Sequence, residues 1–291
     1  MIPGQFEYAR PANVAEALRL LQEREGEAKV LSGGYSLLPL LKLRLAQPGL
    51  LVDIRDLDGL DQVIETETEL RLGARATHAA IENSPIIRGR YPLIADAASG
   101  IGDRQVRNWG TVGGSLAHAD PSADWPAVFI ALGATIVCRS LAGDRLVPAR
   151  DWCLGVFQTA IEPTELLVEV RVPRRPQRAG GAYRKLERRA GDFATVGVAA
   201  VVRLDQAGRI ASAGIGLTAV NDHPFAATEA EAVLTGAQPS DQLFYQAGTA
   251  AAAQANPTSD SHGPADYKRA MVIEMTVRAL RVAVERALAY S

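Results

Sequence analysis

A pair of adjacent glycines, Gly33-Gly34, constrains this chain more than any other local feature. It follows a short apolar stretch at 28–31 and precedes another at 37–45, with Ser32 and Ser36 beside it. Glycine adopts positive φ easily and has no Cβ, so the backbone here can approach a ligand closely. Successive N–H groups can then face one concavity, the local arrangement that binds phosphate oxygens. The sequence therefore indicates a phosphate-binding loop between a strand and a helix.

A second diglycine, Gly113-Gly114, lies further along the chain inside the segment 110–115. A single diglycine is more often a simple turn than a ligand site. Neither segment has the GxGxxG or GK[ST] spacing of the common nucleotide-binding loops, and Leu38 replaces the second glycine that a hydrolase nucleophile elbow requires. Taken together, however, the two diglycines predict two halves of one pyrophosphate clamp.

Length and charge limit the classes of protein that fit. With 291 residues the chain suits two domains, and its 47% hydrophobic content suffices for sizeable cores. The formal net charge is -2, with both signs mixed, which argues against a nucleic-acid partner or a basic membrane anchor. Residues 1–7 lack the pattern of a signal peptide, and no apolar run has the length of a transmembrane segment. We expect a soluble, cytoplasmic protein with no transmembrane segment.

Cysteine and histidine are too sparse for a metal centre. Cys138 and Cys153 lack CxxC spacing, and the four histidines, at 78, 118, 223 and 262, are scattered. A zinc site or an iron–sulfur cluster needs about three or four correctly spaced ligands. We expect two buried thiols and no metal site.

The pattern of apolar residues predicts a small β-α-β unit at the N-terminus. Asn13 with Glu16 three residues later is a variant of the capping box, and the helix that follows ends at Gly26. Strands are expected at 6–8, 28–31 and 50–54. The elements expected after this unit are a hairpin (62–65 and 69–72), helices at 77–83, 92–99 and 125–132, a polar passage at 101–108, and strands at 134–139 and 166–172.

The clearest break in composition is the Pro-Arg-Arg-Pro segment at 173–176. Beyond it, strands are expected at 182–186, 195–204 and 209–217, and helices at 226–234, 240–255 and 264–289. A three-stranded antiparallel sheet covered by helices is the natural packing. The domains expected are residues 1–175, in subdomains of about 1–55 and 56–175, and residues 176–291.

Three motifs in order resemble a known family. They are Leu31-Ser32-Gly33-Gly34-x-Ser36-Leu37-x-Pro39, Ile101-Gly102-x-x-Gln105-Val106-Arg107-Asn108-x-Gly110-Thr111-Val112-Gly113-Gly114, and Asp120-Pro121-x-x-Asp124. The chain resembles the FAD-binding medium subunit of the molybdenum hydroxylases, the xanthine dehydrogenase family, and within it the carbon monoxide dehydrogenase medium subunits. The resemblance covers essentially the whole chain. It implies an α+β fold: a two-subdomain FAD-binding domain of the vanillyl-alcohol-oxidase/MurB-like type, followed by a three-stranded antiparallel sheet with helices.

The resemblance also implies which residues bind the cofactor. One side of the FAD pyrophosphate is assigned to Val30, Leu31, Ser32, Gly33, Gly34, Tyr35, Ser36 and Leu37, and the other to Thr111, Val112, Gly113, Gly114 and Ser115. Ile101 matches an apolar contact, Asp124 a carboxylate that accepts a hydrogen bond from a cofactor hydroxyl, and Leu167 and Lys185 positions near the flavin. Arg184 is an alternative to Lys185, and Phe193 matches a place against the ring.

Each of these residues also has a structural interpretation. Asp124 suits the N-terminus of a helix, Lys185 a solvated strand position and Leu167 the core. Tyr35 stands where close relatives often have histidine, which weakens the assignment to carbon monoxide chemistry. His118 is better read as a polar loop residue than as a covalent flavin anchor, because the family binds FAD non-covalently.

The resemblance implies an electron-transfer subunit. A large partner subunit would carry molybdopterin and oxidise the substrate, and a small one would carry two 2Fe–2S clusters, in a heterotrimer or a dimer of heterotrimers. FAD would pass electrons to a quinone or NAD, so no catalytic side chain is expected here. The substrate stays open among carbon monoxide, a purine, an aldehyde and an N-heterocycle. Two alternatives also stay open: a self-sufficient FAD-dependent reductase of the MurB-like fold and a non-enzymatic nucleotide-binding module.

Overall fold

The computed structural model describes residues 2–290, and its first unit is the expected β-α-β arrangement. Its sheet is parallel, in the order β1-β3-β2. Asn13 Oδ1 accepts the Glu16 N–H at 2.9 Å and Glu16 Oε2 accepts the Ala12 N–H at 2.7 Å, so a capping box starts the first helix. The elements are β1 (Glu7–Ala9), α1 (Val14–Glu23), β2 (Ala28–Leu31), α2 (Leu37–Lys42) and β3 (Leu50–Asp53).

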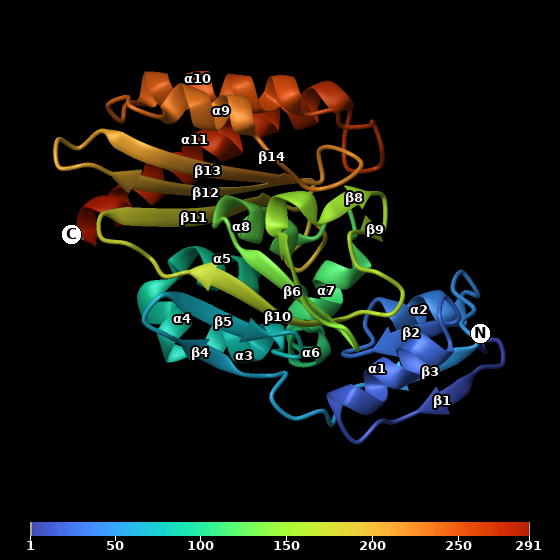
Figure 1. Ribbon diagram of the computed structural model, residues 1–291. Coiled ribbons are helices and arrows are strands. Elements are labelled where there is room, and N and C mark those ends of the chain that lie inside the picture. Colours follow the sequence, from blue (N-terminus) through green and yellow to red (C-terminus); the bar gives the residue numbers. More distant parts are fainter. Residues whose placement is uncertain (1, 291) are drawn as a thin grey trace.

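The second unit is an antiparallel sheet in the order β4-β5-β10-β6-β7 with helices packed on it (Figure 1). Its core contains the fully buried Trp125, Phe129 and Trp152. The strands are β4 (Val63–Glu65), β5 (Glu69–Gly73), β6 (Thr135–Ser140), β7 (Gly143–Pro148) and β10 (Leu166–Pro173), with a separate hairpin of β8 (Cys153–Gly155) and β9 (Gln158–Thr159). The helices are α3 (His78–Asn83), α4 (Pro85–Arg90), α5 (Pro92–Gly100), α6 (Arg104–Trp109), α7 (Val112–His118), α8 (Asp124–Ala131) and the short η1 (Ala149–Asp151).

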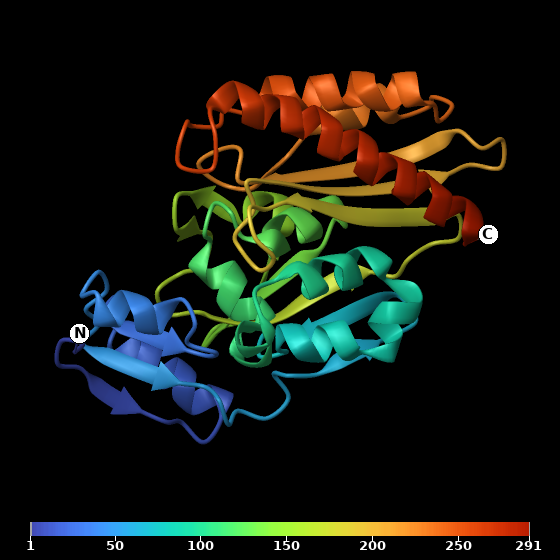
Figure 2. The same ribbon diagram turned by 180° about the vertical axis from the view of Figure 1, so that it is seen from behind.

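The C-terminal part is an antiparallel sheet covered by helices. The α+β prediction is confirmed, but the sheet has a fourth strand, because the short β14 adds to the edge of β13. The elements are β11 (Ala179–Leu186), β12 (Val196–Leu204), β13 (Ile210–Thr218), β14 (Phe225–Ala226), α9 (Thr228–Leu234), α10 (Asp241–Gln254) and α11 (Ala265–Ala289). Figure 2 shows α11 running diagonally across this sheet.

The C-terminal sheet lies between two sets of helices, with α11 on one face and α8 on the other (Figure 1). Glycines allow both approaches. A Cβ at Gly214 would lie 2.1 Å from the Ala131 carbonyl oxygen, and one at Gly216 would lie 2.0 Å from that of Ala127. On the other face, a Cβ at Gly180 would lie 2.0 Å from the Ala283 carbonyl oxygen. The backbones of strand and helix are therefore in direct contact.

Two helices replace segments that the sequence predicted to be irregular. The polar passage at 101–108 contains α6, which begins because Asp103 Oδ1 accepts the Val106 N–H at 2.9 Å. The second diglycine lies in the first turn of α7, with Thr111 as N-cap. Both helices are short and depend on a cap rather than on an apolar stripe, so periodicity did not reveal them.

Candidate functional site

The two diglycine segments lie against each other. Ser32 Oγ and Thr111 Oγ1 are 3.1 Å apart and share a hydrogen bond. A Cβ at Gly33 would lie 1.9 Å from the Trp109 carbonyl oxygen. The space beside Gly33 is thus filled by the backbone that enters the second segment. Glycine is therefore needed at position 33 for the two segments to pack together, and not only for a ligand to approach the backbone.

The first segment presents a row of free donors. No hydrogen bond among residues 2–290 uses the backbone N–H groups of the five consecutive residues from Ser32 to Ser36. Gly34 has φ of +83°, and a Cβ there would meet Leu38 at 2.9 Å. Four of these five residues are half-buried and Tyr35 is exposed, so a ligand at the surface can reach the donors. Such a row fits the oxygen atoms of a diphosphate.

The second segment differs, because its N–H groups already have acceptors. Those of Val112 and Gly113 donate to the carbonyl oxygens of Ala76 and Ala74, at 3.0 and 2.9 Å. Those of Gly114 and Ser115 donate to Thr111, through Oγ1 at 3.1 Å and O at 3.0 Å. The second segment therefore offers hydroxyl groups and a close-packed wall, whereas the free N–H donors belong to the first segment.

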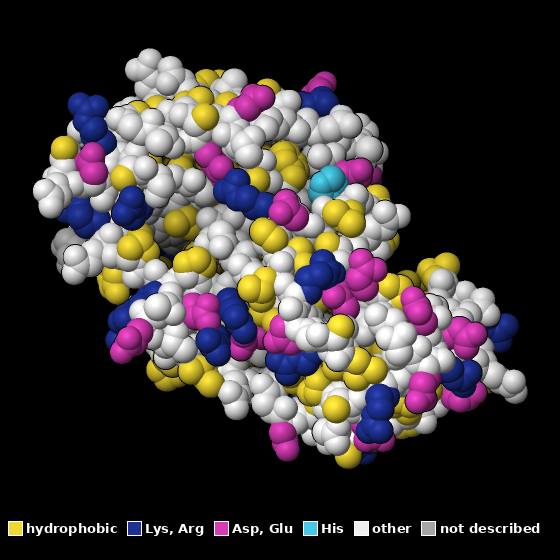
Figure 3. Space-filling model, viewed as in Figure 1, with side chains coloured by type: hydrophobic (Ala, Val, Ile, Leu, Met, Phe, Trp, Pro, Cys, Tyr) yellow, Lys and Arg dark blue, Asp and Glu magenta, His cyan; other side chains and the backbone are white. Residues whose placement is uncertain are grey.

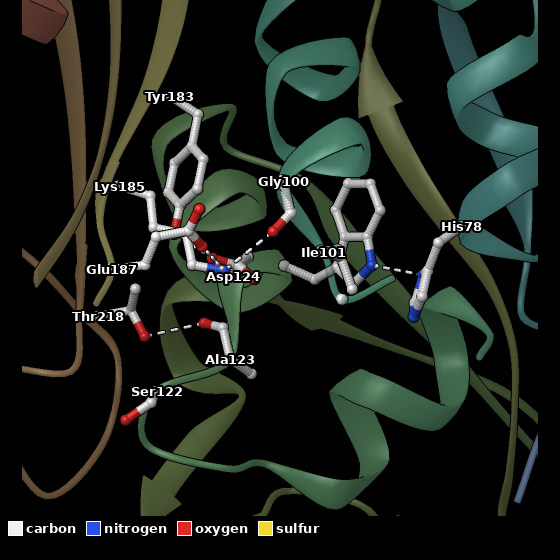
Figure 4. Close-up of polar contacts among 12 residues, drawn as sticks. His78, Gly100, Ile101, Ser122, Ala123, Asp124, Tyr183, Lys185, Glu187 and Thr218 are labelled. Carbon is white, nitrogen blue, oxygen red and sulfur yellow. Dashed lines mark hydrogen bonds and ion pairs between the residues drawn. The ribbon is translucent and has the colours of Figure 1, made fainter. Parts of the chain in front are cut away.

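A buried polar cluster surrounds Asp124, the first residue of α8 (Figure 4). The Tyr183 hydroxyl donates to Asp124 Oδ1 at 2.5 Å, and Lys185 Nζ donates to Oδ2 at 3.3 Å. Lys185 Nζ also donates to the Gly100 carbonyl oxygen at 3.0 Å, where α5 ends. The ammonium thus lies at the negative end of one helix and the carboxylate at the positive end of another, which favours both charges.

Burial perturbs the proton equilibria in this cluster. Desolvation raises the pKa of Asp124, and the neighbouring Lys185 and the Tyr183 hydroxyl oppose that effect. Desolvation and the Asp124 carboxylate together raise the pKa of Tyr183 well above its usual value. Tyr183 therefore remains a hydrogen-bond donor at neutral pH.

Arg184 and Lys185, the two alternatives for one position near the flavin, have different surroundings on the strand. Successive strand residues point to opposite faces. Arg184 Nη1 lies 3.4 Å from Asp96 Oδ2, whereas Lys185 points to Asp124. Glu187 follows on the Lys185 side, with Oε2 3.5 Å from Nζ and without a hydrogen bond among the described residues.

His78 connects this cluster to the second diglycine. Its backbone N–H donates to the Gly110 carbonyl oxygen at 3.0 Å, and its Nδ1 accepts the indole N–H of Trp125, the neighbour of Asp124, at 3.0 Å. A Cβ at Gly110 would lie 2.7 Å from His78 Nε2. Burial and the nearby Arg107 lower the pKa of His78 to about 4, so the ring is neutral at pH 7.

The other residues that the sequence singled out occupy varied places. Ile101 is the C-cap of α5, with its carbonyl oxygen accepting from Arg107 Nη1 at 3.1 Å, and Leu167 is a buried residue of β10. The Phe193 side chain is 56% exposed. His118 ends α7 and packs against Phe157, with ring centroids 5.0 Å apart.

Both thiols are buried, as expected, and burial raises the pKa of each to about 12. No group of three or more metal-ligating side chains occurs among residues 2–290. No helix in the described part of the chain is long and apolar enough to cross a bilayer.

A separate hollow of about 100 Å³ opens where the two domains join (Figure 3). It is lined by the start of α5, the segment 173–176 and Gly180-Gly181. Arg175 at its edge is already engaged, because its guanidinium lies 3.9 Å from the centroid of the Tyr290 ring. The hollow holds none of the residues predicted to bind the cofactor.

Sequence reasoning missed Tyr183, Glu187 and His78. The spacing of 183, 185 and 187 could have indicated the first two, because alternate residues of an extended segment point to the same side. Nothing local pointed to His78, whose partners lie 32 and 47 residues away along the chain.

Comparison with known proteins gives matches over nearly the whole chain. The family model described as the FAD binding domain in molybdopterin dehydrogenase matches residues 4–175, and that of the CO dehydrogenase flavoprotein C-terminal domain matches residues 181–283. The carbon monoxide dehydrogenase medium chain of Afipia carboxidovorans is 42% identical over 289 residues, covering 99% of both chains. The 6-hydroxypseudooxynicotine dehydrogenase complex subunit alpha of Paenarthrobacter nicotinovorans is 37% identical, covering 99% of this chain and 97% of its own.

Solved structures agree with these sequence matches. Carbon monoxide dehydrogenase from Hydrogenophaga pseudoflava superimposes with a TM-score of 0.95 at 43% identity, covering 98% of this chain and 99% of that one. Quinoline 2-oxidoreductase from Pseudomonas putida superimposes with a TM-score of 0.92 at 34% identity, covering 99% and 100%.

Proposed function

The chain belongs to the family of FAD-binding medium subunits of molybdopterin dehydrogenases, and on that premise we propose that it carries FAD as the electron-transfer subunit of a molybdenum hydroxylase. The observation that best supports this proposal is the row of free N–H groups from Ser32 to Ser36 beside the Thr111 hydroxyl. A diphosphate between two nucleosides is the ligand that such a row and a hydroxyl-bearing wall suit.

The residues of this chain have distinct tasks in the proposed site. Backbone N–H groups of the first diglycine bind the diphosphate, and Gly33 lets the two segments meet. The hydroxyls of Ser32, Ser36, Thr111 and Ser115 add donors. Ile101 supplies an apolar contact, and Asp124, held by Lys185, accepts a hydrogen bond from a cofactor hydroxyl. Bound FAD would supply one- and two-electron transfer, with the protein placing and tuning the ring.

The remaining assigned residues form the walls of the site. Val30, Leu31, Tyr35 and Leu37 flank the first diglycine, Val112 precedes the second diglycine, Gly113-Gly114, and Leu167 lies near the flavin. The domain limits, 1–175 for FAD binding and 176–291 for the C-terminal domain, also remain a proposal. The ranges of the two matched family models favour them.

We infer further that this subunit assembles with a large molybdopterin subunit and a small 2Fe–2S subunit. The names of the relatives as medium chains or subunits of dehydrogenases favour such an assembly. Electrons would leave FAD for a quinone or NAD. Three points remain predictions: the acceptor, the number of heterotrimers and a cytoplasmic location. The substrate stays open among the four classes named above.

Calorimetric titration of the purified full-length chain with FAD, FMN and ADP tests the proposal. FMN shares the flavin and lacks the diphosphate bridge, whereas ADP keeps the diphosphate. We expect FAD to bind far more tightly than FMN and ADP to compete with it. Equal affinity for FAD and FMN would contradict the clamp, and substrate oxidation by the lone chain would contradict the subunit role. Co-purification of a tagged chain should recover a cysteine-rich partner and a much larger one.

A further inference from the structure

Two residues of β11 bind Asp124. Tyr183 and Lys185 are alternate residues, so their side chains leave the strand on the same side, and Glu187 comes directly after the last residue of the strand. Figure 4 shows the three side chains directed toward the start of α8. Tyr183 donates a hydrogen bond to one oxygen of the Asp124 carboxylate, and Lys185 donates to the other. That carboxylate is therefore held from two directions.

The fold makes specific room for the Tyr183 hydroxyl. The residue opposite Lys185 on β12 is Gly197, and a Cβ there would lie 2.4 Å from Tyr183 Oη. The Tyr183 side chain is 4% exposed and Asp124 is 6% exposed, so their hydrogen bond is shielded from water. Burying a carboxylate is costly unless it is paired and hydrogen-bonded. An apolar ring at 183 would pack equally well, so packing alone does not account for the hydroxyl.

We propose that Tyr183 is a positioning residue for the cofactor: its hydroxyl holds the Asp124 carboxylate in the orientation in which that carboxylate accepts a hydrogen bond from FAD. Lys185 fixes the second oxygen and is itself anchored on the Gly100 carbonyl oxygen. This inference rests on the proposed function and adds to it a residue that no motif indicated. Tyr183 acts through Asp124 and need not touch the cofactor.

A double-mutant cycle on FAD affinity tests the inference. A hydrogen bond to a charged group contributes enough that Tyr183→Phe should raise the Kd for FAD about tenfold. Asp124→Ala, which leaves no acceptor for the Tyr183 hydroxyl, should raise it at least as much. If Tyr183 acts through Asp124, the double variant should bind FAD no more weakly than Asp124→Ala alone, to within about twofold. Additive losses, or an unchanged Kd in Tyr183→Phe, would overturn the inference.

A matched control separates positioning from stability. The buried Tyr91 hydroxyl donates to Glu65 Oε1 at 2.9 Å, outside the site. Tyr91→Phe should lower the Tm by an amount similar to Tyr183→Phe and leave the Kd for FAD unchanged. A parallel loss of FAD affinity in Tyr91→Phe would show that Tyr183 acts only through global stability.

Two further arms keep the test decisive. Should Tyr183→Phe fail to fold, Gly197→Ala enters the same cycle, because its Cβ would lie 2.4 Å from Tyr183 Oη, and 2.5 Å from Thr218 Cγ2, and would displace the hydroxyl without removing it. It should raise the Kd for FAD in the native background and not in Asp124→Ala. If the wild-type chain fails to bind FAD, the proposed function fails and this inference with it. Normal wild-type binding with an additive cycle overturns this inference alone.

Discussion

Trp125 donates its indole N–H to Nδ1 of His78 at 3.0 Å, within a pair that is almost wholly buried. The neutral imidazole therefore carries its proton on Nε2. Because the backbone N–H of His78 also donates to the Gly110 carbonyl oxygen, this residue joins the start of α8, through its ring, to the segment that enters the second diglycine, through its backbone. Protonation of this ring would place an unpaired charge in the core beside Arg107.

The stability of the chain should depend on pH through His78. The folded pKa of about 4 lies below the ordinary histidine pKa of 6.5, so between these values the unfolded chain binds more protons. The contribution is fully present above pH 6.5, is lost as pH falls and levels off below pH 4. It amounts to about 3 kcal/mol at one pKa unit per 1.36 kcal/mol. Urea unfolding of wild type and His78→Gln at pH 7 and pH 4.5 measures it.

The difference between these two chains should shrink as pH falls, because His78→Gln lacks the titrating ring. A constant gap between wild type and His78→Gln across this range would contradict the burial argument.

Gly33→Ala should separate the two diglycine segments. The added Cβ would collide with the Trp109 carbonyl oxygen at 1.9 Å, and this oxygen belongs to backbone that cannot swing aside. We expect a lower Tm together with loss of FAD from the purified chain. Visible absorbance and differential scanning calorimetry measure the two effects. Gly89→Ala in α4 is the control: no atom lies within 4 Å of its new Cβ, so it should be neutral or stabilise by about 0.5–1 kcal/mol.

Thr111→Ala should remove both a helix cap and a clamp hydroxyl. Loss of the bond from the Gly114 N–H costs about 1 kcal/mol. Loss of the hydroxyl beside Ser32 should additionally weaken FAD binding. Ser240→Ala is the control: it also removes a helix cap, because Ser240 Oγ accepts the Leu243 N–H at the start of α10 at 3.1 Å. It should therefore lower stability without weakening FAD binding. Equal Kd values for FAD in the two variants would argue against a role of Thr111 in binding.

Gly216→Val should destabilise the contact between the two domains. Its side chain would displace the Ala127 backbone, which a Cβ would approach to 2.0 Å. Overpacking of this kind costs about 1–3 kcal/mol or more. Calorimetry should show a lower Tm, or two transitions in place of one if the domains part. An unchanged Tm would mean that strand and helix can move apart without loss.

The sequence predicted elements whose signals are local. Helix α1 was found because Asn13, Glu16 and an apolar stripe agree, and α11 because its stripe is long. Helix α7 was missed because its glycines discourage a helix locally. Carbonyl oxygens of Ala74 and Ala76, distant along the chain, accept the N–H groups of Gly113 and Val112 instead.

The candidate site divides in the same way. Contiguous motifs indicated both diglycines and Asp124. The two diglycine segments meet through the contact between Ser32 and Thr111. The Tyr183–Asp124 bond joins residues 59 positions apart, and neither residue type at its own position requires the other. Likewise, Gly214 and Gly216 look like poor strand residues in the sequence of β13. Their role depends on α8, which packs on them and lies far from them along the chain.

The direct backbone contact between β13 and α8 limits which C-terminal domains could replace the present one. Exchanging the C-terminal module for that of a relative with a bulkier residue at 214 or 216 would push α8 outward, and Asp124 sits on the first turn of that helix. A hybrid built for a new electron acceptor would therefore have to inherit both glycines, or it would displace Asp124 and with it the proposed FAD site.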